Sequence, residues 1–445
     1  MPDKNNENGY TNGNRQNDLL CESNMTYRRV RNVGMIAKRL AGMDGVSLEA
    51  AKWAHVLEGE GLNCFFLAGE LDRPGEKSME VPLAHFKHPE IVAINKECYG
   101  KCTRKPSITK KIHEIKDKLK EDIYKFIRKF KIDLLIPENA ITIPLNIPFG
   151  LAITEVIAET AIPTIAHHHD FYWERQRFLT NSVWDYLNMA FPPHLPSIHH
   201  VVINSAADKQ LSLRTGASST IIPNVMDFEN PPDPPDEYAR DVRETLGIAD
   251  DELFVLQPTR VVRRKGIEHA IEFVLRLKQK AKLVFSHASG DEGNEYEQRV
   301  REYSKLMGVD TLFVSDCINE KRGSTKTGKK IYTLYDIYPH CDLVTYPSEF
   351  EGFGNAFLEA IYFKKPIVVN RYTIYSTDIK PKGFKVVELD GYVTPKALNQ
   401  TRHILSDDVI REKIVNDNYE LGRRYYSYSI LREKLRNLIH HGPGA

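Results

Sequence analysis

Residues 343–369 read LVTYPSEFEGFGNAFLEAIYFKKPIVV, and this stretch decides the fold class. It opens with a short apolar run typical of a buried strand, turns through Gly352 and Gly354, continues with apolar residues at helical spacing and closes with a second apolar run. A strand, a helix and another strand in this order form a βαβ unit, which builds a parallel sheet covered by helices. The stretch therefore predicts an α/β fold.

The same alternation continues on both sides of this stretch. In the C-terminal half it predicts strands at 253–259, 283–286, 311–315, 343–346 and 366–369, and helices from 267, near 292–306, near 331–338 and at 355–363. In the N-terminal half it predicts strands at 33–37, 63–68, 132–136, 164–166 and 201–204, and helices at 48–57 and 112–130. Two such halves predict two doubly wound, Rossmann-like domains that face each other across a cleft, with ligands at the carboxyl ends of the strands.

A proline-rich segment marks the boundary between the halves. Residues 230–237 read NPPDPPDE, and four prolines in five positions exclude both a helix and a central strand. We therefore expect an N-terminal domain at 28–229, completed by a returning helix at 418–445, and a C-terminal domain at 230–417. Residues 1–27 are rich in Asn and lack an apolar segment, which predicts a disordered tail and excludes a secretory signal.

Length and composition agree with two globular domains. The chain has 445 residues, of which 41% are hydrophobic and 27% charged, and its formal net charge of +1 argues against a nucleic-acid partner. No apolar run is long enough to predict a membrane span. The six cysteines are too few and too irregularly spaced for a disulfide framework. We interpret them as reduced thiols of a cytoplasmic protein.

Two segments of the chain are strongly basic. Residues 101–130 contain eleven Lys or Arg and four Asp or Glu, which leaves open a peripheral membrane contact and a solvated helix face. We favour the solvated face because the apolar residues have the spacing of a core-packing helix. Residues 319–330, NEKRGSTKTGKK, follow a predicted strand on the ligand side of the sheet. They either shape a substrate pocket or form a surface loop.

Glu351 and Glu359 are the first candidates for chemistry. Glu351 lies on the turn between strand and helix, where backbone N–H groups and the positive helix end attract anions and sugar hydroxyls. Glu359 follows eight residues later, about two helical turns by the 3.6-residue period, so both carboxylates point to the same side. One can meet a reacting sugar while the other meets a more distant polyol.

Arg260 and Lys265 are the second pair of candidates. They flank a short loop between a strand end and the helix that begins near Gly266. Two cations beside a helix N-terminus suit a diphosphate, because each charge-assisted hydrogen bond contributes roughly 1.5–3 kcal/mol. The chain contains no Asp-x-Asp motif, so we expect these cations to take the place of a metal ion.

Residues 253–370 resemble the retaining glycosyltransferases of family 4, which have the GT-B fold and use nucleotide-sugar donors. The resemblance extends over residues 30–440. It rests on Arg-x4-Lys at 260–265, on Glu-Gly-Phe-Gly-x4-Glu at 351–359, and on Leu334-Tyr335 and Cys341-Asp342. It implies a metal-independent hexosyltransferase that moves glucose or mannose from a UDP- or GDP-linked donor to a hydroxyl of a small acceptor, retains the anomeric configuration and needs no further cofactor.

The resemblance also implies a role for each candidate residue. Arg260 and Lys265 would hold the donor diphosphate and neutralise the leaving nucleotide, while Glu359 would bind the ribose. The transferred sugar would contact Glu351, Gly352, Phe353, Gly354 and Asn355, although Asn355 stands where the family often has an apolar residue or Gly. The glycine loop of the opposite domain, with Gly45, Val46 and Ser47, would approach the diphosphate or the acceptor.

Three consecutive histidines end a predicted strand of the N-terminal half. Residues 165–178 read IAHHHDFYWERQRF. Neighbouring residues of an extended chain point to opposite sides, so the three rings cannot form one chelating face and we expect no metal site. The family places a His against the donor sugar at this strand end. His169 fits best, His168 is the alternative in register, and a polar loop over packed aromatic residues is the structural alternative.

The residues after the histidines indicate a class of acceptor. The segment is similar to transferases that act on small acidic acceptors such as glucosylglycerate. Asp170, Arg175 and Arg177 are then acceptor candidates, since an arginine can pair with a carboxylate; the same residues could equally be structural.

Three other classes of protein share a two-domain cleft of this kind: a sugar-nucleotide epimerase, a disaccharide phosphorylase and a non-catalytic sugar-nucleotide binding protein. A protein that only binds has no need for both cations and both carboxylates, which argues against the last class. An epimerase converts the donor sugar without an acceptor, whereas a transferase releases nucleoside diphosphate only when an acceptor is present.

Overall fold

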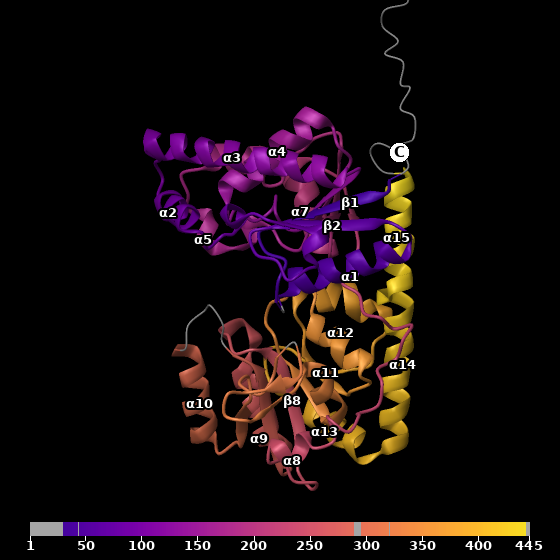
Figure 1. The fold of residues 1–445 in the computed structure, drawn as a ribbon. Coiled ribbons are helices and arrows are strands. Elements are labelled where there is room, and N and C mark those ends of the chain that lie inside the picture. The colour runs from indigo at the N-terminus through magenta and orange to yellow at the C-terminus, as the bar shows by residue number, and fades with distance from the viewer. Residues whose placement is uncertain (1–29, 43, 289–294, 320, 442–445) are drawn as a thin grey trace, which may run out of the picture.

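The computed structural model describes residues 30–42, 44–288, 295–319 and 321–441. The tail predicted at 1–27 lies outside the described residues. The described part forms two domains, each built on a parallel sheet that is covered by helices (Figure 1). The predicted architecture of two Rossmann-like α/β domains is therefore confirmed.

The N-terminal sheet has the strand order β3-β2-β1-β4-β5-β6-β7. Its strands are β1 (Asn32–Ile36), β2 (Asn63–Ala68), β3 (Ser78–Glu80), β4 (Leu134–Pro137), β5 (Thr164–His168), β6 (Ile198–Val202) and β7 (Ser219–Ile221). The helices of this half are α1 (Gly45–Gly59), α2 (Pro89–Cys98), α3 (Pro106–Phe130), α4 (Ile147–Thr160), α5 (Gln176–Leu179), α6 (Trp184–Ala190) and α7 (Ser205–Thr215). The sequence pattern located the five longest of these strands but missed the short strands β3 and β7.

Helix α3 has the amphipathic pattern that its sequence predicts. Pro106 opens the helix at its first position, where a missing N–H costs nothing. The apolar residues that carry the predicted pattern are buried: Ile112, Ile115, Leu119, Ile123, Phe126 and Phe130. On the polar side, Lys116 and Lys120 both contact Glu155 of α4. These ion pairs support a solvated, charge-balanced helix face.

The C-terminal sheet has the strand order β10-β9-β8-β13-β14-β15. Its strands are β8 (Leu253–Arg260), β9 (Ala281–His287), β10 (Thr311–Phe313), β13 (Leu343–Tyr346), β14 (Ile367–Asn370) and β15 (Val387–Leu389), and a separate hairpin contains β11 (Gly323–Ser324) and β12 (Lys330–Ile331). The helices are α8 (Val242–Thr245), α9 (Ile267–Leu277), α10 (Glu295–Met307), α11 (Leu334–Ile337), α12 (Asn355–Tyr362), α13 (Pro395–Ser406) and α14 (Asp408–Tyr426).

One helix of this half starts later than predicted. The sequence pattern placed a helix near 331–338, but α11 begins at Leu334 because Thr333 caps it in a reciprocal capping box with Asp336. The residues before the cap belong to the β11–β12 hairpin. Arg322 ties that hairpin to the rest of the domain through ion pairs with Asp236 and Asp336.

The C-terminal end of the chain differs from the single returning helix expected at 418–445. The structure has two helices, because α14 ends at Tyr426 and α15 (Tyr428–His441) begins after Ser427. The helix is interrupted because the carbonyl of Tyr426 accepts a hydrogen bond from the backbone N–H of Met226, 2.9 Å away. Helix α14 packs on α12 and α13 of the C-terminal domain, and only α15 packs against the N-terminal domain (Figure 1).

Helix α15 completes one face of the N-terminal sheet. Leu431, Leu435 and Leu438 lie in one apolar cluster with Trp53 of α1 and Val33 of β1. The chain thus crosses between the domains twice, near 226 and near 427, and the two crossings are paired by a backbone bridge between Met226 and Ser427.

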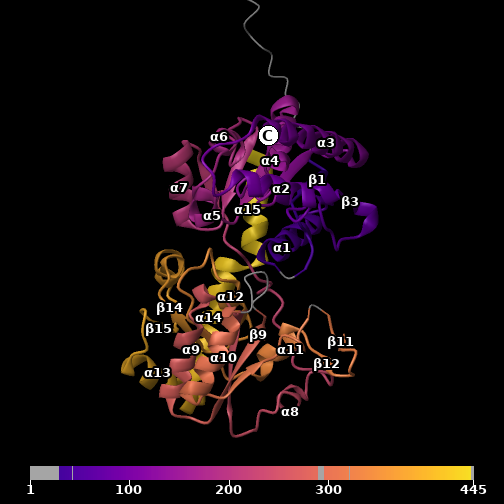
Figure 2. The same ribbon diagram turned by 90° about the vertical axis from the view of Figure 1, so that its left-hand side faces the viewer.

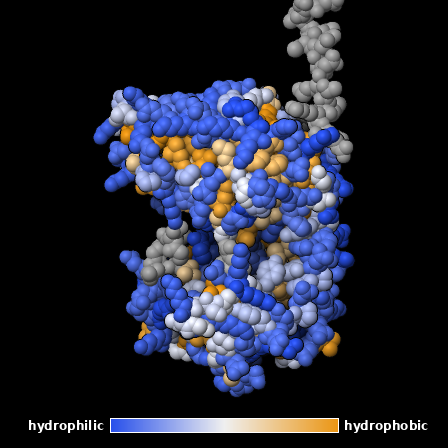
Figure 3. Space-filling model, in the orientation of Figure 1, coloured by the Kyte–Doolittle hydropathy of each residue, from blue (hydrophilic) through white to orange (hydrophobic). Residues whose placement is uncertain are grey.

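The two domains leave a hollow between them on the side away from α14 and α15, visible as a notch in Figure 3. Figure 2 looks into the molecule from that side and shows α1 at the junction of the two domains. Within the described residues, no helix is both long enough and apolar enough to cross a membrane. The five cysteines in this part of the chain are all free thiols.

Candidate active site

The turn after β13 can form only because two positions lack a Cβ atom. At Gly354 the φ angle is 121°, and a Cβ would lie 2.6 Å from the hydroxyl oxygen of Tyr372. At Gly266, where φ is 60°, a Cβ would lie 2.2 Å from the carbonyl oxygen of Pro347. The second contact presses the basic loop after β8 against the turn after β13. The two motifs that the sequence suggested separately are therefore neighbours at the carboxyl ends of adjacent strands.

Glu351 is at the centre of this half of the site. Its carboxylate is buried and forms ion pairs with Lys265 and with Arg264, whose Nη1 lies 3.2 Å from Oε2. Burial alone would raise the pKa of Glu351, but the charges of Lys265 and Arg264 outweigh it and hold that pKa below its ordinary value. The turn therefore presents an ionised carboxylate held by two cations.

Lys265 and Arg260, the two cations predicted to act together, lie in different environments in the structure. Lys265 is buried against Glu351, as a residue at the site should be, whereas Arg260 lies exposed at the end of β8. Arg264, which the prediction passed over, is the second cation in contact with the carboxylate. Its only signal in the sequence is its membership of the run Arg263-Arg264-Lys265.

Glu359 lies on α12, eight residues after Glu351, and its side chain is half-buried. Its Oε2 accepts a hydrogen bond from the hydroxyl of Tyr338 at 2.8 Å. Burial raises the pKa of Glu359, partly offset by this hydrogen bond and by the charge of Lys52 from the N-terminal domain. Tyr338 thus fixes one carboxylate oxygen and leaves the other for a ligand. It was missed because nothing in the sequence links it to Glu359, 21 residues away.

Phe353, in the middle of the turn, is fixed by contacts within the protein. The Phe353 side chain is buried and its ring packs edge-on against Tyr426, with ring centroids 5.2 Å apart. Its carbonyl accepts a hydrogen bond from the hydroxyl of Tyr372 at 2.8 Å. Among the residues predicted to hold the sugar, Phe353 therefore acts as a core residue through its side chain.

In the glycine loop of the N-terminal domain, some backbone N–H groups already have hydrogen-bond partners within the protein. Asp44 caps α1 and accepts hydrogen bonds from the backbone N–H groups of Val46 and Ser47 at 3.1 and 3.2 Å. The Ser47 hydroxyl also donates to Asp44, at 2.6 Å. Gly45, by contrast, faces the other domain: a Cβ there would lie 3.6 Å from the side-chain nitrogen of Asn355.

Two asparagines hold the domains together across the cleft. The Asn204 amide donates to the carbonyl of Gly352 at 2.6 Å, and the Asn224 amide donates to Oδ1 of Asn355 at 2.6 Å. Asn355, which departs from the family pattern, is therefore an interdomain contact. Both bonds end on the turn that follows β13, so closure of the domains positions that turn.

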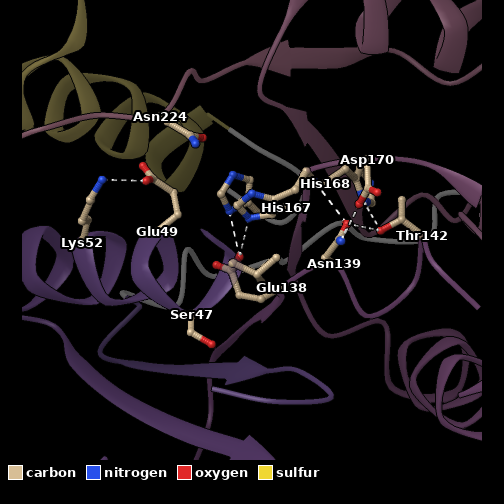
Figure 4. Close-up of polar contacts among 12 residues, drawn as sticks. Ser47, Glu49, Lys52, Glu138, Asn139, Thr142, His167, His168, Asp170 and Asn224 are labelled. Carbon is tan, nitrogen blue, oxygen red and sulfur yellow. Dashed lines mark hydrogen bonds and ion pairs between the residues drawn. The ribbon is translucent and has the colours of Figure 1, made fainter. Parts of the chain in front are cut away.

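His169 and His167 lie on the same side of the chain, next to Glu138 from the neighbouring strand end. His167 Nδ1 lies 2.9 Å from Glu138 Oε2 (Figure 4). His169 Nε2 lies 3.5 Å from the same oxygen. Alternate residues of an extended chain share one side, so the prediction of no chelating face, made for neighbouring histidines, does not hold for His167 and His169. Among the described residues, these three side chains are the one group of His, Cys, Asp or Glu whose potential ligand atoms lie within 4.8 Å of one another.

The two candidate histidines differ in where they point. His168 is fully buried on the opposite side and its Nε2 lies 2.8 Å from Nδ1 of His200. The His169 side chain keeps 10% exposure, and its backbone oxygen lies 3.5 Å from the position of a Cβ on Gly352. Burial lowers the pKa of His167 to about 3 and also lowers that of His169, so both rings are neutral near pH 7.

The predicted acceptor residues form a charged group beside the histidines. Asp170 is held in an ion pair with Arg175 and by the Asn139 amide at 2.8 Å, while Arg177 is exposed over the ring of Phe178. Arg175 is therefore occupied, and Arg177 is the better placed for a ligand.

Sequence reasoning missed a third cation in this group. Lys38 follows β1 and donates from Nζ to the carbonyls of Asn139 and Ile143, at 2.6 and 2.9 Å. Burial lowers its pKa to about 7; Asp170 acts in the opposite direction, and Arg175 and Arg177 add to the lowering. A positive residue directly after the first apolar strand was the signal that could have found it.

Two Rossmann-like domains with ionised side chains gathered on facing strand ends have the architecture of the GT-B fold. Residues 239–402 match the family described as Glycosyl transferases group 1. The chain is also 33% identical to the mannosylglucosylglycerate synthase of Thermotoga maritima over 437 residues, which covers 91% of this chain and 98% of the relative. The chain therefore belongs to the group 1 glycosyl transferases, and it is a hexosyltransferase.

Two further comparisons agree with this assignment. A mannosylglucosylglycerate synthase of Petrotoga mobilis is 33% identical over 387 residues, with 80% of this chain and 86% of the relative covered. The crystal structure of a glycosyltransferase from Rickettsia africae superposes with a TM-score of 0.65, covering 92% of this chain and 98% of that one at 14% identity. This last likeness supports the fold.

Proposed function

We propose that the protein transfers a mannosyl group from a GDP- or UDP-linked donor to a hydroxyl of glucosylglycerate or a closely related acidic glycoside. The observation that carries the proposal is the 33% identity to a mannosylglucosylglycerate synthase along 98% of that relative's length. Transfer of glucose instead of mannose would use the same site. A cytoplasmic location stays a prediction from the sparse cysteines.

The donor half of the proposal rests on the C-terminal domain. We assign the diphosphate to Lys265 and Arg260 with the N-terminal end of α12, and the ribose to the free oxygen of Glu359. Cations that face charge growing on the departing diphosphate stabilise the transition state without a metal ion. We place the transferred sugar between Glu351 and His169, which lie on opposite walls of the cleft.

Closure of the cleft makes the second contribution to catalysis in this proposal. The contacts of Asn204 and Asn224 with the turn after β13 hold the two walls together, so that the sugar carbon and the acceptor hydroxyl can be kept in reacting geometry. Gly45 contributes a close backbone approach from the other wall. Retention of the anomeric configuration is part of this proposal and comes from the family resemblance.

The acceptor half rests on the cations of the N-terminal domain. We assign the acceptor carboxylate to Arg177, with Lys38 behind it, because Arg175 is neutralised by Asp170. A guanidinium recognises a carboxylate with two parallel hydrogen bonds. The arrangement supports an acidic acceptor over a neutral one.

The test is a transfer assay with purified protein. GDP-mannose, GDP-glucose, UDP-mannose and UDP-glucose are each incubated with and without glucosylglycerate, and released nucleoside diphosphate and sugar products are quantified. Release that requires the acceptor, with a mannose-containing product, supports the proposal. Conversion of the donor sugar without an acceptor would indicate an epimerase, and binding with no reaction would indicate a binding protein.

The acceptor assignment has its own control. Arg177→Gln should raise KM for glucosylglycerate by roughly tenfold or more, because a charge-assisted hydrogen bond is lost, and leave KM for neutral glucosylglycerol unchanged. Arg128→Gln, which removes an exposed arginine that also lies over an aromatic ring but on α3, should change neither value. Equal effects on both acceptors would place the carboxylate elsewhere.

A further inference from the structure

The carboxyl ends of β4 and β5 bring together three side chains that are metal ligands in many proteins. Glu138 follows β4 directly, His167 lies within β5 and His169 follows it by one residue. The backbone pairs Glu138 with His167 in a parallel bridge, so the relative position of these side chains is set by the sheet. Two imidazoles and one carboxylate form a set typical of zinc and related transition metals.

The distances from the Glu138 carboxylate to the two imidazoles suit a shared ion. Around a tetrahedral ion with bonds of about 2.0–2.1 Å, neighbouring ligand atoms lie roughly 3.3 Å apart. Glu138 Oε2 lies 2.9 Å from His167 Nδ1 and 3.5 Å from His169 Nε2. The first distance also fits a hydrogen bond, but the second is at the limit of one, and His169 Nε2 has no hydrogen-bond partner.

The cluster also contains buried polar atoms for which the protein provides no hydrogen-bond partner. Glu138 Oε1, His167 Nε2 and His169 Nε2 are all buried without a hydrogen-bond partner. Among the residues that the structure describes, no Lys or Arg side chain pairs with the Glu138 carboxylate, which is fully buried. A buried carboxylate without a cation is costly, and a divalent ion bound to the carboxylate would remove that cost.

Surrounding residues hold the ligands in place. Trp53 stacks on the His167 ring with centroids 4.0 Å apart, and the Asn139 side chain accepts a hydrogen bond from the backbone N–H of His169. Glu49 and Lys52, shown beside His167 in Figure 4, pair with each other at 3.0 Å. Supports of this kind orient metal ligands in known metal sites.

We propose that Glu138, His167 and His169 bind one divalent transition-metal ion of the zinc type at the floor of the cleft. The His169 side chain is the most exposed of the three, at 10%, so we place the open coordination position on the side of the cleft, where a hydroxyl of the sugar or the acceptor can take it. The site lies on the domain opposite Lys265. It is therefore separate from the metal-free diphosphate site and goes beyond the proposed function.

The test is direct measurement of ion binding. All variants are made in a Cys21→Ser, Cys102→Ser background, because Cys102 is exposed and free thiols bind zinc. The protein is stripped with a chelator, and Zn²⁺ and Co²⁺ are titrated with calorimetry, elemental analysis and, for Co²⁺, the visible absorption spectrum. We expect one ion per chain and a Co²⁺ spectrum typical of tetrahedral coordination.

Variants locate the ion within the chain. Glu138→Gln, which keeps the shape of the side chain, and His169→Asn, at the partly exposed position, should each weaken binding at least tenfold. His199→Ala is the matched control: it removes a histidine of β6 whose ring is hydrogen-bonded to Thr220. This variant should bind as the parent does.

Two results would overturn the proposal. One is a chelator-treated parent protein that takes up neither ion, a measurement that needs no variant and cannot be confused with misfolding. The other is equal uptake by the parent, Glu138→Gln and His169→Asn, which would put the ion elsewhere. Far-ultraviolet circular dichroism of each variant confirms that it is folded. Neither result bears on mannosyl transfer, which is measured separately.

Discussion

Replacing Glu351 with Gln should separate the structural role of this carboxylate from its chemical role. The side chain is 8% exposed and ion-paired with Lys265 and Arg264. The Gln amide has nearly the same shape, so no cavity forms, but it carries no charge. Lys265 is then buried beside a neutral group, and Arg264 loses its carboxylate.

The expected cost in stability is substantial. Removing one partner of a buried ion pair costs about 3–5 kcal/mol, because the other charge stays buried. The Gln oxygen still accepts one hydrogen bond from a cation, which recovers roughly 1.5 kcal/mol, so we expect the free energy of unfolding to fall by about 1.5–3.5 kcal/mol. Turnover should fall by about a hundredfold or more, since the carboxylate is also assigned to the transferred sugar.

Urea denaturation with and without nucleoside diphosphate measures both effects. At a ligand concentration of about one hundred times Kd, the parent should gain roughly 2.7 kcal/mol. Glu351→Gln should gain at least as much, because the diphosphate now supplies the negative charge that Lys265 lacks. Glu349→Gln, an exposed change on the same turn, should alter neither stability nor turnover. If Glu351→Gln matched the parent in stability and rate, the ion pair would contribute to neither.

Four further expectations follow from contacts elsewhere in the molecule. Tyr338→Phe should weaken nucleoside diphosphate binding by about fivefold, measured by calorimetry, because Glu359 loses a hydrogen bond worth about 1 kcal/mol; unchanged affinity would exclude the ribose assignment. Asn224→Ala should reduce turnover and raise the radius of gyration in X-ray scattering, since its bond to Asn355 holds the domains together; a variant as compact and active as the parent would show that this contact is dispensable. Burial lowers the pKa of His200 from 6.5 to about 4, so below pH 6.5 the unfolded chain binds a proton that the folded chain does not, and stability should fall towards pH 4 by up to about 1.4 kcal/mol per pH unit. His200→Gln should flatten that slope in urea titrations at pH 7 and pH 5, and an identical slope would refute the attribution. Nucleoside diphosphate binding to the parent should survive EDTA, and loss of binding that Mg²⁺ restores would reject the metal-free diphosphate site.

The sheets could be predicted because each central strand is a short apolar run between turn residues. The strand at 343–346 was located to the residue, and 63–68 likewise. The short edge strands β3 and β7 were missed, since neither is fully buried and neither has an apolar run. The break at Ser427 could not be foreseen either, because its cause is a backbone hydrogen bond from Met226, 200 residues earlier in the chain.

The candidate site, too, could be predicted only in part. Motifs that lie on one turn, such as Glu351 and the glycines around Phe353, could be found because their spacing alone is informative. Contacts between motifs could not: the pairing of Glu351 with Arg264 depends on how closely Gly266 lets two loops approach. Glu138 and Lys38 could have been predicted from the sequence, since each is a charged residue just after a buried strand, where a parallel sheet places its ligands.

The position of α15 has a consequence for the order in which the protein can be made. The first domain to leave the ribosome lacks one covering layer of its sheet until residues 428–441 have been synthesised, which happens only after the whole second domain. The second domain is continuous in sequence and can fold as soon as it emerges. We therefore expect the domain made second to fold first, while the earlier half waits with the apolar surface around Trp53 and Val33 uncovered and available to chaperones.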